Sequence, residues 1–109
     1  MHFFYLFLWF IVVIMIESEI QRQIIDYLES FGHMVYRMNA GKGRYNIRLS
    51  PAGTPDLLVI MDNSSVWIEV KQPGKVPTDV QLEQYNRLMA KGQVVIVCTS
   101  VDDVKKGLM

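Results

Sequence analysis

Cysteine and histidine are scarce in this 109-residue chain, and their scarcity excludes several kinds of site. The single cysteine, Cys98, cannot form an internal disulfide, and a cysteine-based zinc site would need partners that the chain lacks. Cys98 ends the apolar run 94–98, which is typical of a small buried core residue. The two histidines, His2 and His33, lie far apart without ligand-like spacing, so we assign neither to a site.

The chain also lacks a net charge, because its 11 lysines and arginines are balanced by 11 aspartates and glutamates. Proteins that attract nucleic acid through a global positive field carry a large excess of basic residues. Any contact between this chain and nucleic acid must therefore come from a local basic patch. The length is that of one domain, and half of the residues are hydrophobic, so a normal core is expected.

One apolar run stands out at residues 3–16, and it is shorter than the roughly 18 to 20 residues that a membrane-spanning helix needs. No lysine or arginine precedes it and no small-residue cleavage site follows it, unlike in a cleaved signal peptide. Three interpretations fit: a weak anchor or uncleaved signal, an apolar extension packed on a partner, or a true start at Met15.

We favour the start at Met15, because the composition changes abruptly at Glu17. The sequence therefore divides into an apolar N-terminal extension, residues 1–16, and one domain, residues 17–109.

The domain alternates between helical and strand-like patterns. Apolar residues spaced by three and four predict a helix over residues 17–31, which Gly32 ends. An unbroken run of valine and isoleucine at 94–97 predicts that the strand at 94–99 is covered on both faces. The other predicted elements are strands at 33–38, 56–61 and 66–72, a short strand or loop at 47–49, a helix from the N-cap Thr78 to about 91, and a helix at 101–107 capped by Ser100.

Charged residues mark the ends of two predicted strands. Asp56 opens one strand directly after a turn, and Glu69 and Lys71 lie near the end of the next. A strand alternates its faces with a period of two, so Glu69 and Lys71 point to the same side. Two carboxylates and an ammonium beside a buried sheet are costly unless something compensates them. Because carboxylate oxygens are ligands that Mg²⁺ takes, the pattern predicts a divalent-cation site with Lys71 alongside.

A surface aspartate and a solvated Glu–Lys pair are the alternative, since Glu-x-Lys is common by chance. Three details favour the site instead. Asp56 sits at a strand end, the hairpin turn at 62–65 is tight enough to pair the two strands, and the strands are otherwise apolar.

Seven residues carry a resemblance to a known family: Gly53, Pro55, Asp56, Glu69, Lys71, Gln81 and Tyr85. Their order and expected elements resemble the PD-(D/E)XK nuclease superfamily, and in particular its small stand-alone VRR-Nuc domains of phage and bacterial type. The resemblance covers residues 17–104. It implies an α/β fold with a restriction-endonuclease-like core, in which helices flank a central mixed β-sheet in the order αβββαβα.

The resemblance also implies roles for the site residues. Asp56 and Glu69 would bind one or two Mg²⁺ or Mn²⁺ ions, together with Glu19 of the first helix and the backbone carbonyl of Val70. Lys71 would be the catalytic lysine, and Gln81 would orient it or a phosphate. Taken without the resemblance, Glu19 fits a helix-dipole residue and Gln81 a solvated one.

Basic residues surround this site in sequence order and predict a rim that contacts nucleic-acid phosphates. They are Lys42, Arg44, Arg48 and Lys75, with Arg37 before them. Tyr85, one turn after Gln81, is assigned to the same contact, although it also fits a core residue. For Lys42 alone a solubilising loop is the preferred interpretation.

The resemblance implies a Mg²⁺-dependent deoxyribonuclease that acts as a homodimer, with branched or junction DNA as a further expectation. We expect Lys71 to act electrostatically, because a free lysine amine is protonated near pH 7. No small-molecule cofactor and no membrane contact are expected, and the location is cytoplasmic, provided that residues 1–16 are not an anchor. Two alternatives stay open: an inert nucleic-acid-binding domain of the same fold, and a protein tethered to a membrane by residues 3–16.

Overall fold

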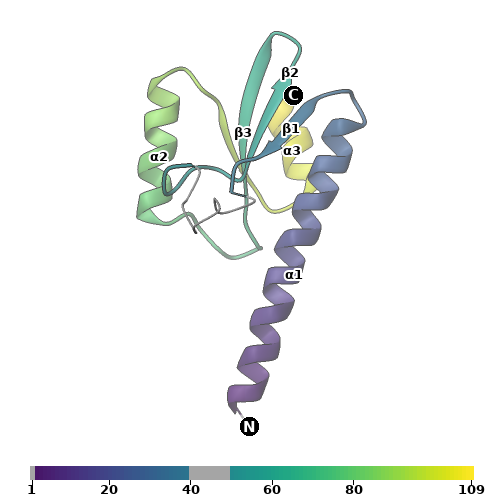
Figure 1. Cartoon of the computed structure of the whole chain (residues 1–109), viewed down its shortest axis with the longest axis vertical. Coiled ribbons are helices and arrows are strands. Elements are labelled where there is room, and N and C mark those ends of the chain that lie inside the picture. The colour runs from purple at the N-terminus through teal and green to yellow at the C-terminus, as the bar shows by residue number, and fades with distance from the viewer. Residues whose placement is uncertain (1, 40–49) are drawn as a thin grey trace.

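The computed structural model describes residues 2–39 and 50–109. Its elements are α1 (His2–Glu29), β1 (Met34–Arg37), β2 (Leu57–Met61), β3 (Ser64–Val70), α2 (Asp79–Ala90), β4 (Val95–Cys98) and α3 (Val101–Leu108) (Figure 1). The predicted order αβββαβα is confirmed. The short strand considered at 47–49 lies outside the described residues.

The strands form one sheet in the order β1-β2-β3-β4. The first three strands are antiparallel and β4 runs parallel to β3, so the sheet is mixed, as predicted. Strands β2 and β3 are joined by a two-residue turn rather than by the predicted turn at 62–65, so β3 begins at Ser64 and not at residue 66. In this turn Asn63 adopts a φ of 61°, a left-handed conformation that asparagine tolerates. Leu57 pairs with Ile68, and continuing this register by one residue sets Asp56 opposite Glu69.

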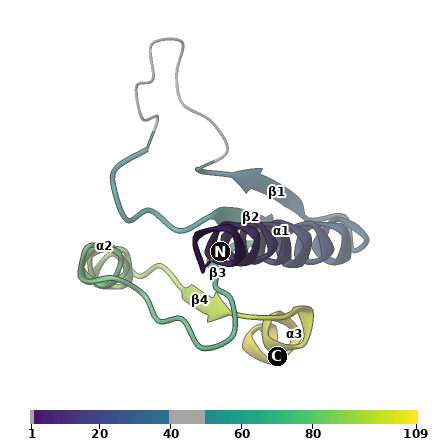
Figure 2. The same cartoon turned by 90° about the horizontal axis from the view of Figure 1, so that it is seen from below.

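The core lies between the sheet and the helices α1 and α3. Ile24 and Leu28 of α1 and Val104 of α3 are fully buried against sheet residues such as Leu57 and Ile68. Burying each such side chain stabilises the fold by about 1.5 to 3 kcal/mol. Figure 2 shows α1 and α3 on one side of the sheet and α2 on the other, so charged residues on the strand ends meet α2 as well as α1.

Two further predictions about the elements are wrong. Strand β4, which ends the sheet, is not covered on both faces, because the Val97 side chain is 43% exposed. The first helix begins at His2 rather than at residue 17 and ends at Glu29 rather than at 31. No glycine or proline interrupts the sequence before Gly32, so nothing in the chain breaks the helix where the composition changes.

The N-terminal part of α1 projects away from the domain (Figure 1). Its apolar side chains from residue 4 to residue 12 are all exposed. Within the described residues, α1 is the one helix that is long and apolar enough to cross a membrane, a property that signal sequences share. The prediction that this segment is too short to span a membrane is therefore wrong, because the helix continues beyond the apolar run at residues 3–16. Its C-terminal part, however, contributes Ile24 and Leu28 to the core of the domain.

Candidate active site

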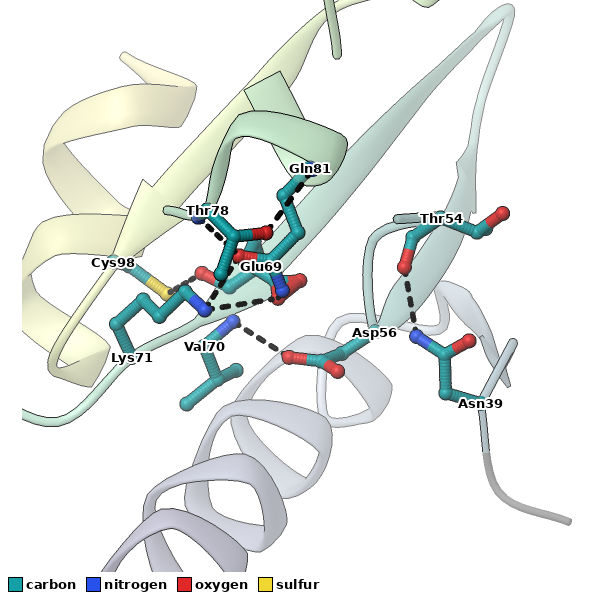
Figure 3. Close-up of polar contacts among 9 residues, drawn as sticks. All are labelled: Asn39, Thr54, Asp56, Glu69, Val70, Lys71, Thr78, Gln81 and Cys98. Atoms are coloured by element: carbon teal, nitrogen blue, oxygen red, sulfur yellow. Dashed lines mark hydrogen bonds and ion pairs between the residues drawn. The ribbon is translucent and has the colours of Figure 1, made fainter. Parts of the chain in front are cut away.

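The hairpin of β2 and β3 brings three charged side chains together (Figure 3). The Lys71 Nζ lies 3.8 Å from the Glu69 Oε1, and the two side chains are only 13% and 4% exposed. The Asp56 Oδ2 accepts a hydrogen bond of 2.9 Å from the backbone N–H of Val70. The structure thus places Asp56, Glu69 and Lys71 in one site, as the period of the strand and the tight hairpin predicted.

Gln81, in the first turn of α2, connects this site to the helix. Its side-chain oxygen accepts hydrogen bonds from the Lys71 Nζ, at 2.7 Å, and from the backbone N–H of Thr78, at 2.9 Å. Its side-chain amide donates to the Glu69 Oε1 at 3.2 Å. The Thr78 hydroxyl in turn accepts from the Gln81 backbone N–H, which completes a capping box. The cap therefore fixes the side chain that holds Lys71.

The negatively charged forms of the two carboxylates are disfavoured, because burial raises both pKa values and the charge of Asp56 further raises that of Glu69. Burial, and then the charge of Asp56, raise the pKa of Glu69 to about 7, although Lys71 opposes the shift. Burial likewise raises the pKa of Asp56, against the effect of the hydrogen bond from Val70. The Glu69 Oε2 is buried and has no hydrogen-bond partner among the described residues. A cation beside these oxygens would compensate both effects.

A polar cavity of about 280 Å³ opens over these groups. It is lined by Glu17, Ser18, Gln21, Asp56, Glu69, Val70, Lys71 and Gln81. Its wall therefore comes from α1, from the residue before β2, from the end of β3 and from α2. Within the described residues no group of three or more His, Cys, Asp or Glu side chains forms a metal-binding cluster. The carboxylates in the cavity wall are Asp56 and Glu69 at the sheet and Glu17 on α1.

The prediction that Glu19 joins the metal site is wrong. Glu19 is exposed and forms an ion pair of 2.6 Å with Arg22, whose hydrogen bond lowers the pKa of the Glu19 carboxyl. Two residues along an α-helix correspond to a rotation of about 200°, so Glu19 points away when Glu17 faces the cavity. Gln21 lies four residues after Glu17 and lines the same cavity.

The predicted nucleic-acid contacts are only partly described. Lys42, Arg44 and Arg48 lie outside the described residues. Lys75 is exposed in the loop after β3 and is not part of the cavity wall.

Tyr85 is buried, only 3% exposed, so the prediction that it contacts nucleic acid is wrong. Its hydroxyl makes no hydrogen bond of good geometry among the described residues, but it lies close enough to the Glu69 carboxylate that each group shifts the pKa of the other. Burial, and then the charge of Glu69, raise the pKa of Tyr85. The residue is therefore part of the support behind the site.

Cys98 is a core residue, as the apolar run around it predicted. The side chain is buried, and its Sγ lies 3.5 Å from the backbone oxygen of Glu69. Burial raises the pKa of the thiol to about 12, so the group is inert near neutral pH.

The turn that carries Asp56 is held by contacts that the sequence did not indicate. The Asn39 side-chain amide donates to the backbone oxygen of Thr54 at 2.7 Å (Figure 3). Gly53 has a φ of +84°, and a Cβ at this position would lie 2.6 Å from the backbone oxygen of Val80 in α2. The absence of a side chain at Gly53 therefore lets the turn of Asp56 approach the helix that carries Gln81.

Replacing Gly53 with alanine should destabilise the protein by roughly 2 to 4 kcal/mol, because backbone strain and a clash with backbone add up. Gly74→Ala is the matched control: its φ is +88°, but nothing lies within 4 Å of the added Cβ. Thermal unfolding should show a clearly larger decrease in Tm for Gly53→Ala than for Gly74→Ala. Equal decreases would mean that the close approach to α2 contributes nothing.

No family model matches the sequence. The chain is 33% identical over 87 residues to "Putative nuclease p44" of Acyrthosiphon pisum secondary endosymbiont phage 1, covering 79% of this chain and 85% of that protein. A solved structure described as a VRR_NUC domain superposes with a TM-score of 0.70 at 25% sequence identity, covering 85% of this chain and 94% of that one. Each similarity spans more than two thirds of both chains and therefore concerns the whole domain rather than one motif.

Proposed function

Because the chain belongs to the VRR-Nuc family of nucleases, we propose that it hydrolyses phosphodiester bonds in DNA with the help of a divalent cation. The observation that carries the proposal is the convergence of Asp56, Glu69, Lys71 and Gln81 on one polar cavity. This arrangement provides carboxylates for a cation and a fixed ammonium for a phosphate or a water.

The donor set fits Mg²⁺ or Mn²⁺. Asp56 and Glu69 would hold one or two ions, and the backbone carbonyl of Val70, a residue of the cavity wall, is retained as a further proposed ligand. The buried, unpartnered Oε2 of Glu69 supports this assignment. When bound, the ion would lower the pKa of a water molecule and offset negative charge on the phosphate.

The remaining residues orient and stabilise the reacting groups. The Lys71 ammonium lies at the cavity wall and can donate to a non-bridging phosphate oxygen or to the attacking water. Gln81 limits its movement, because the Gln81 side-chain oxygen accepts from Lys71 while the cap of α2 restrains the amide. Preorganised donors of this kind need no rearrangement during the reaction, which is where their catalytic effect arises.

A homodimer acting on branched or junction DNA in the cytoplasm completes the proposal. A 109-residue chain offers a small surface, and a two-fold dimer would match the symmetry of a four-way junction. Zero net charge supports contacts through a local patch rather than through the whole surface.

Incubation with Mg²⁺ or Mn²⁺ and a panel of linear, flapped and four-way DNAs tests this function. We expect cleavage that depends on the ion and stops when EDTA is added, because the carboxylates would lose the ion that they hold. Cleavage products are resolved on denaturing gels. Intact DNA with both ions, together with no Mn²⁺ binding by calorimetric titration, would support the inert nucleic-acid-binding domain instead.

The same assay should include a chain that starts at Met15. We expect it to cleave like the full chain, because the side chains from residue 4 to residue 12 are exposed and the cavity wall begins at Glu17. That exposed apolar segment is also the observation that favours a membrane tether. Recovery of the full chain in the membrane fraction of cells, with the Met15 chain in the soluble fraction, would support the tether.

A further inference from the structure

A second cavity, of about 170 Å³, adjoins the candidate active site. It is lined by Gln21, Arg37, Asn39 and Asp56. Gln21 and Asp56 also line the first cavity, so these two residues form the shared wall. A ligand that passes over Asp56 can therefore occupy both cavities at once.

Arg37 gives the second cavity its positive charge. It ends β1 and pairs with Leu57, the residue directly after Asp56. Val35, two residues earlier, packs against the core, so the alternation of the strand turns Arg37 to the α1 side, where Gln21 lies. Arg37 is exposed and forms no ion pair with any residue in the described ranges.

Two side-chain amides line this cavity, and they differ in whether a hydrogen bond already holds them. The Asn39 amide donates to Thr54, so it helps to fix the turn of Asp56 rather than to bind a ligand. The side chain of Gln21 makes no hydrogen bond to the part of the chain that the structure describes. An arginine and a glutamine amide facing one cavity match the oxygens of a phosphate, which a guanidinium can bind in a bidentate manner.

We propose that Arg37, with Gln21, binds the phosphate next to the one that is cleaved. The inference rests on the proposed function, which places the scissile phosphate at Lys71. A nucleic-acid strand carries one phosphate per nucleotide, so a strand at Lys71 must extend across Asp56 or away from it. Because the second cavity lies beyond Asp56, we expect the strand to run across Asp56 towards Arg37. The substrate therefore needs a nucleotide on the Arg37 side of the cleaved bond.

A binding measurement in EDTA tests the subsite without cleavage. The variant is Arg37→Gln, and Arg87→Gln is its control, because Arg87 lies in the last turn of α2 and its loss removes the same charge. The probe is a fluorescently labelled DNA oligonucleotide followed by anisotropy. We expect Kd to rise about tenfold for Arg37→Gln and less than about twofold for Arg87→Gln. The slope of log Kd against log salt concentration should decrease by about one for Arg37→Gln and stay unchanged for Arg87→Gln.

A cleavage measurement then locates the contact. A single uncharged methylphosphonate is placed on either side of the cut, and KM is measured for the wild type and for Arg37→Gln. At one of these positions the methylphosphonate should raise the wild-type KM about tenfold but should not change KM further in Arg37→Gln, because both changes remove the same contact. Thermal unfolding confirms that the exposed substitution leaves the fold intact.

The outcomes separate the two proposals. If the wild type cleaves DNA but Arg37→Gln and Arg87→Gln behave alike, or if the methylphosphonate and Arg37→Gln effects simply add, the subsite is wrong and the nuclease proposal stands. If the wild type cleaves no DNA but its binding depends on Arg37 as expected, the catalytic proposal fails, while the phosphate contact at Arg37 is supported.

Discussion

Replacing Glu69 with glutamine should abolish cleavage and, at the same time, stabilise the metal-free protein at pH 8. Glutamine keeps the shape of the side chain and removes its charge, so it cannot hold a divalent cation in the same way. We expect a loss of at least about 1,000-fold in kcat, because the chemistry of the ion is lost as a whole. The gain in stability follows from the burial of the carboxylate.

The sign of the stability change follows from proton binding. The pKa of Glu69 is raised from 4.5 to about 7 in the folded protein, so the folded state binds more protons between these pH values. The free energy of unfolding therefore falls as the pH rises through this window, and at pH 8 the folded protein carries the full cost of burying the ionised Glu69 carboxylate. Each unit of pKa corresponds to about 1.4 kcal/mol, so removing the charge should stabilise the protein by on the order of 2 kcal/mol at pH 8.

Thermal unfolding at pH 4.5 and pH 8, with and without Mg²⁺, measures this effect. The Tm of Glu69→Gln should exceed that of the wild type at pH 8 without the ion, whereas Mg²⁺ should raise only the wild-type Tm appreciably. Glu83→Gln, a change at an exposed position of α2, is the matched control and should shift neither Tm nor activity. A Glu69→Gln protein that unfolds at a lower temperature than the wild type at pH 8 would contradict the assignment of Glu69 as a destabilising, cation-binding carboxylate.

The strand residues of the site could be predicted from the sequence because their geometry is local. The period of two places Glu69 and Lys71 on one side, and a two-residue turn sets Asp56 opposite Glu69. The N-cap Thr78 was also predicted, but its capping box with Gln81 was not, although a threonine followed three residues later by a glutamine is the signature of that box. In each case the information lies within a few residues of chain.

The residues that were predicted wrongly depend on how helices dock. To predict that Glu17 rather than Glu19 lines the cavity, one must know how α1 is rotated about its axis, and the packing of α1 on the sheet decides that rotation. To predict that Tyr85 is buried, one must know where α2 lies on the sheet, because a tyrosine four residues after Gln81 fits a surface or a core equally well. The exposure of Val97 on β4 could not be predicted either, because a run of Val and Ile is typical of a strand covered on both faces, and only the packing of the helices shows which face stays open.

Removing the Lys71 charge should reduce kcat by about 100- to 1,000-fold with little change in KM, because a preorganised donor stabilises the transition state more than the bound substrate. Lys71→Met keeps most of the length of the side chain and removes only the ammonium. The position of this ammonium depends on Gln81, whose oxygen lies 2.7 Å from the Lys71 Nζ. We therefore expect Gln81→Ala to reduce kcat as well, by roughly tenfold, through a lysine that is present but no longer held.

Gln81 also caps α2, so the loss of activity must be separated from the loss of the cap. Thr78→Ala makes that separation: it removes the hydroxyl that accepts from the Gln81 backbone, but the backbone N–H of Thr78 can still donate to the Gln81 side chain. Both variants should lose about 1 kcal/mol of stability, as cap substitutions do. Only Gln81→Ala should lose activity, because only there does the contact with Lys71 disappear. If Thr78→Ala were as inactive as Gln81→Ala, the role of Gln81 would lie in the helix cap and not in holding the lysine.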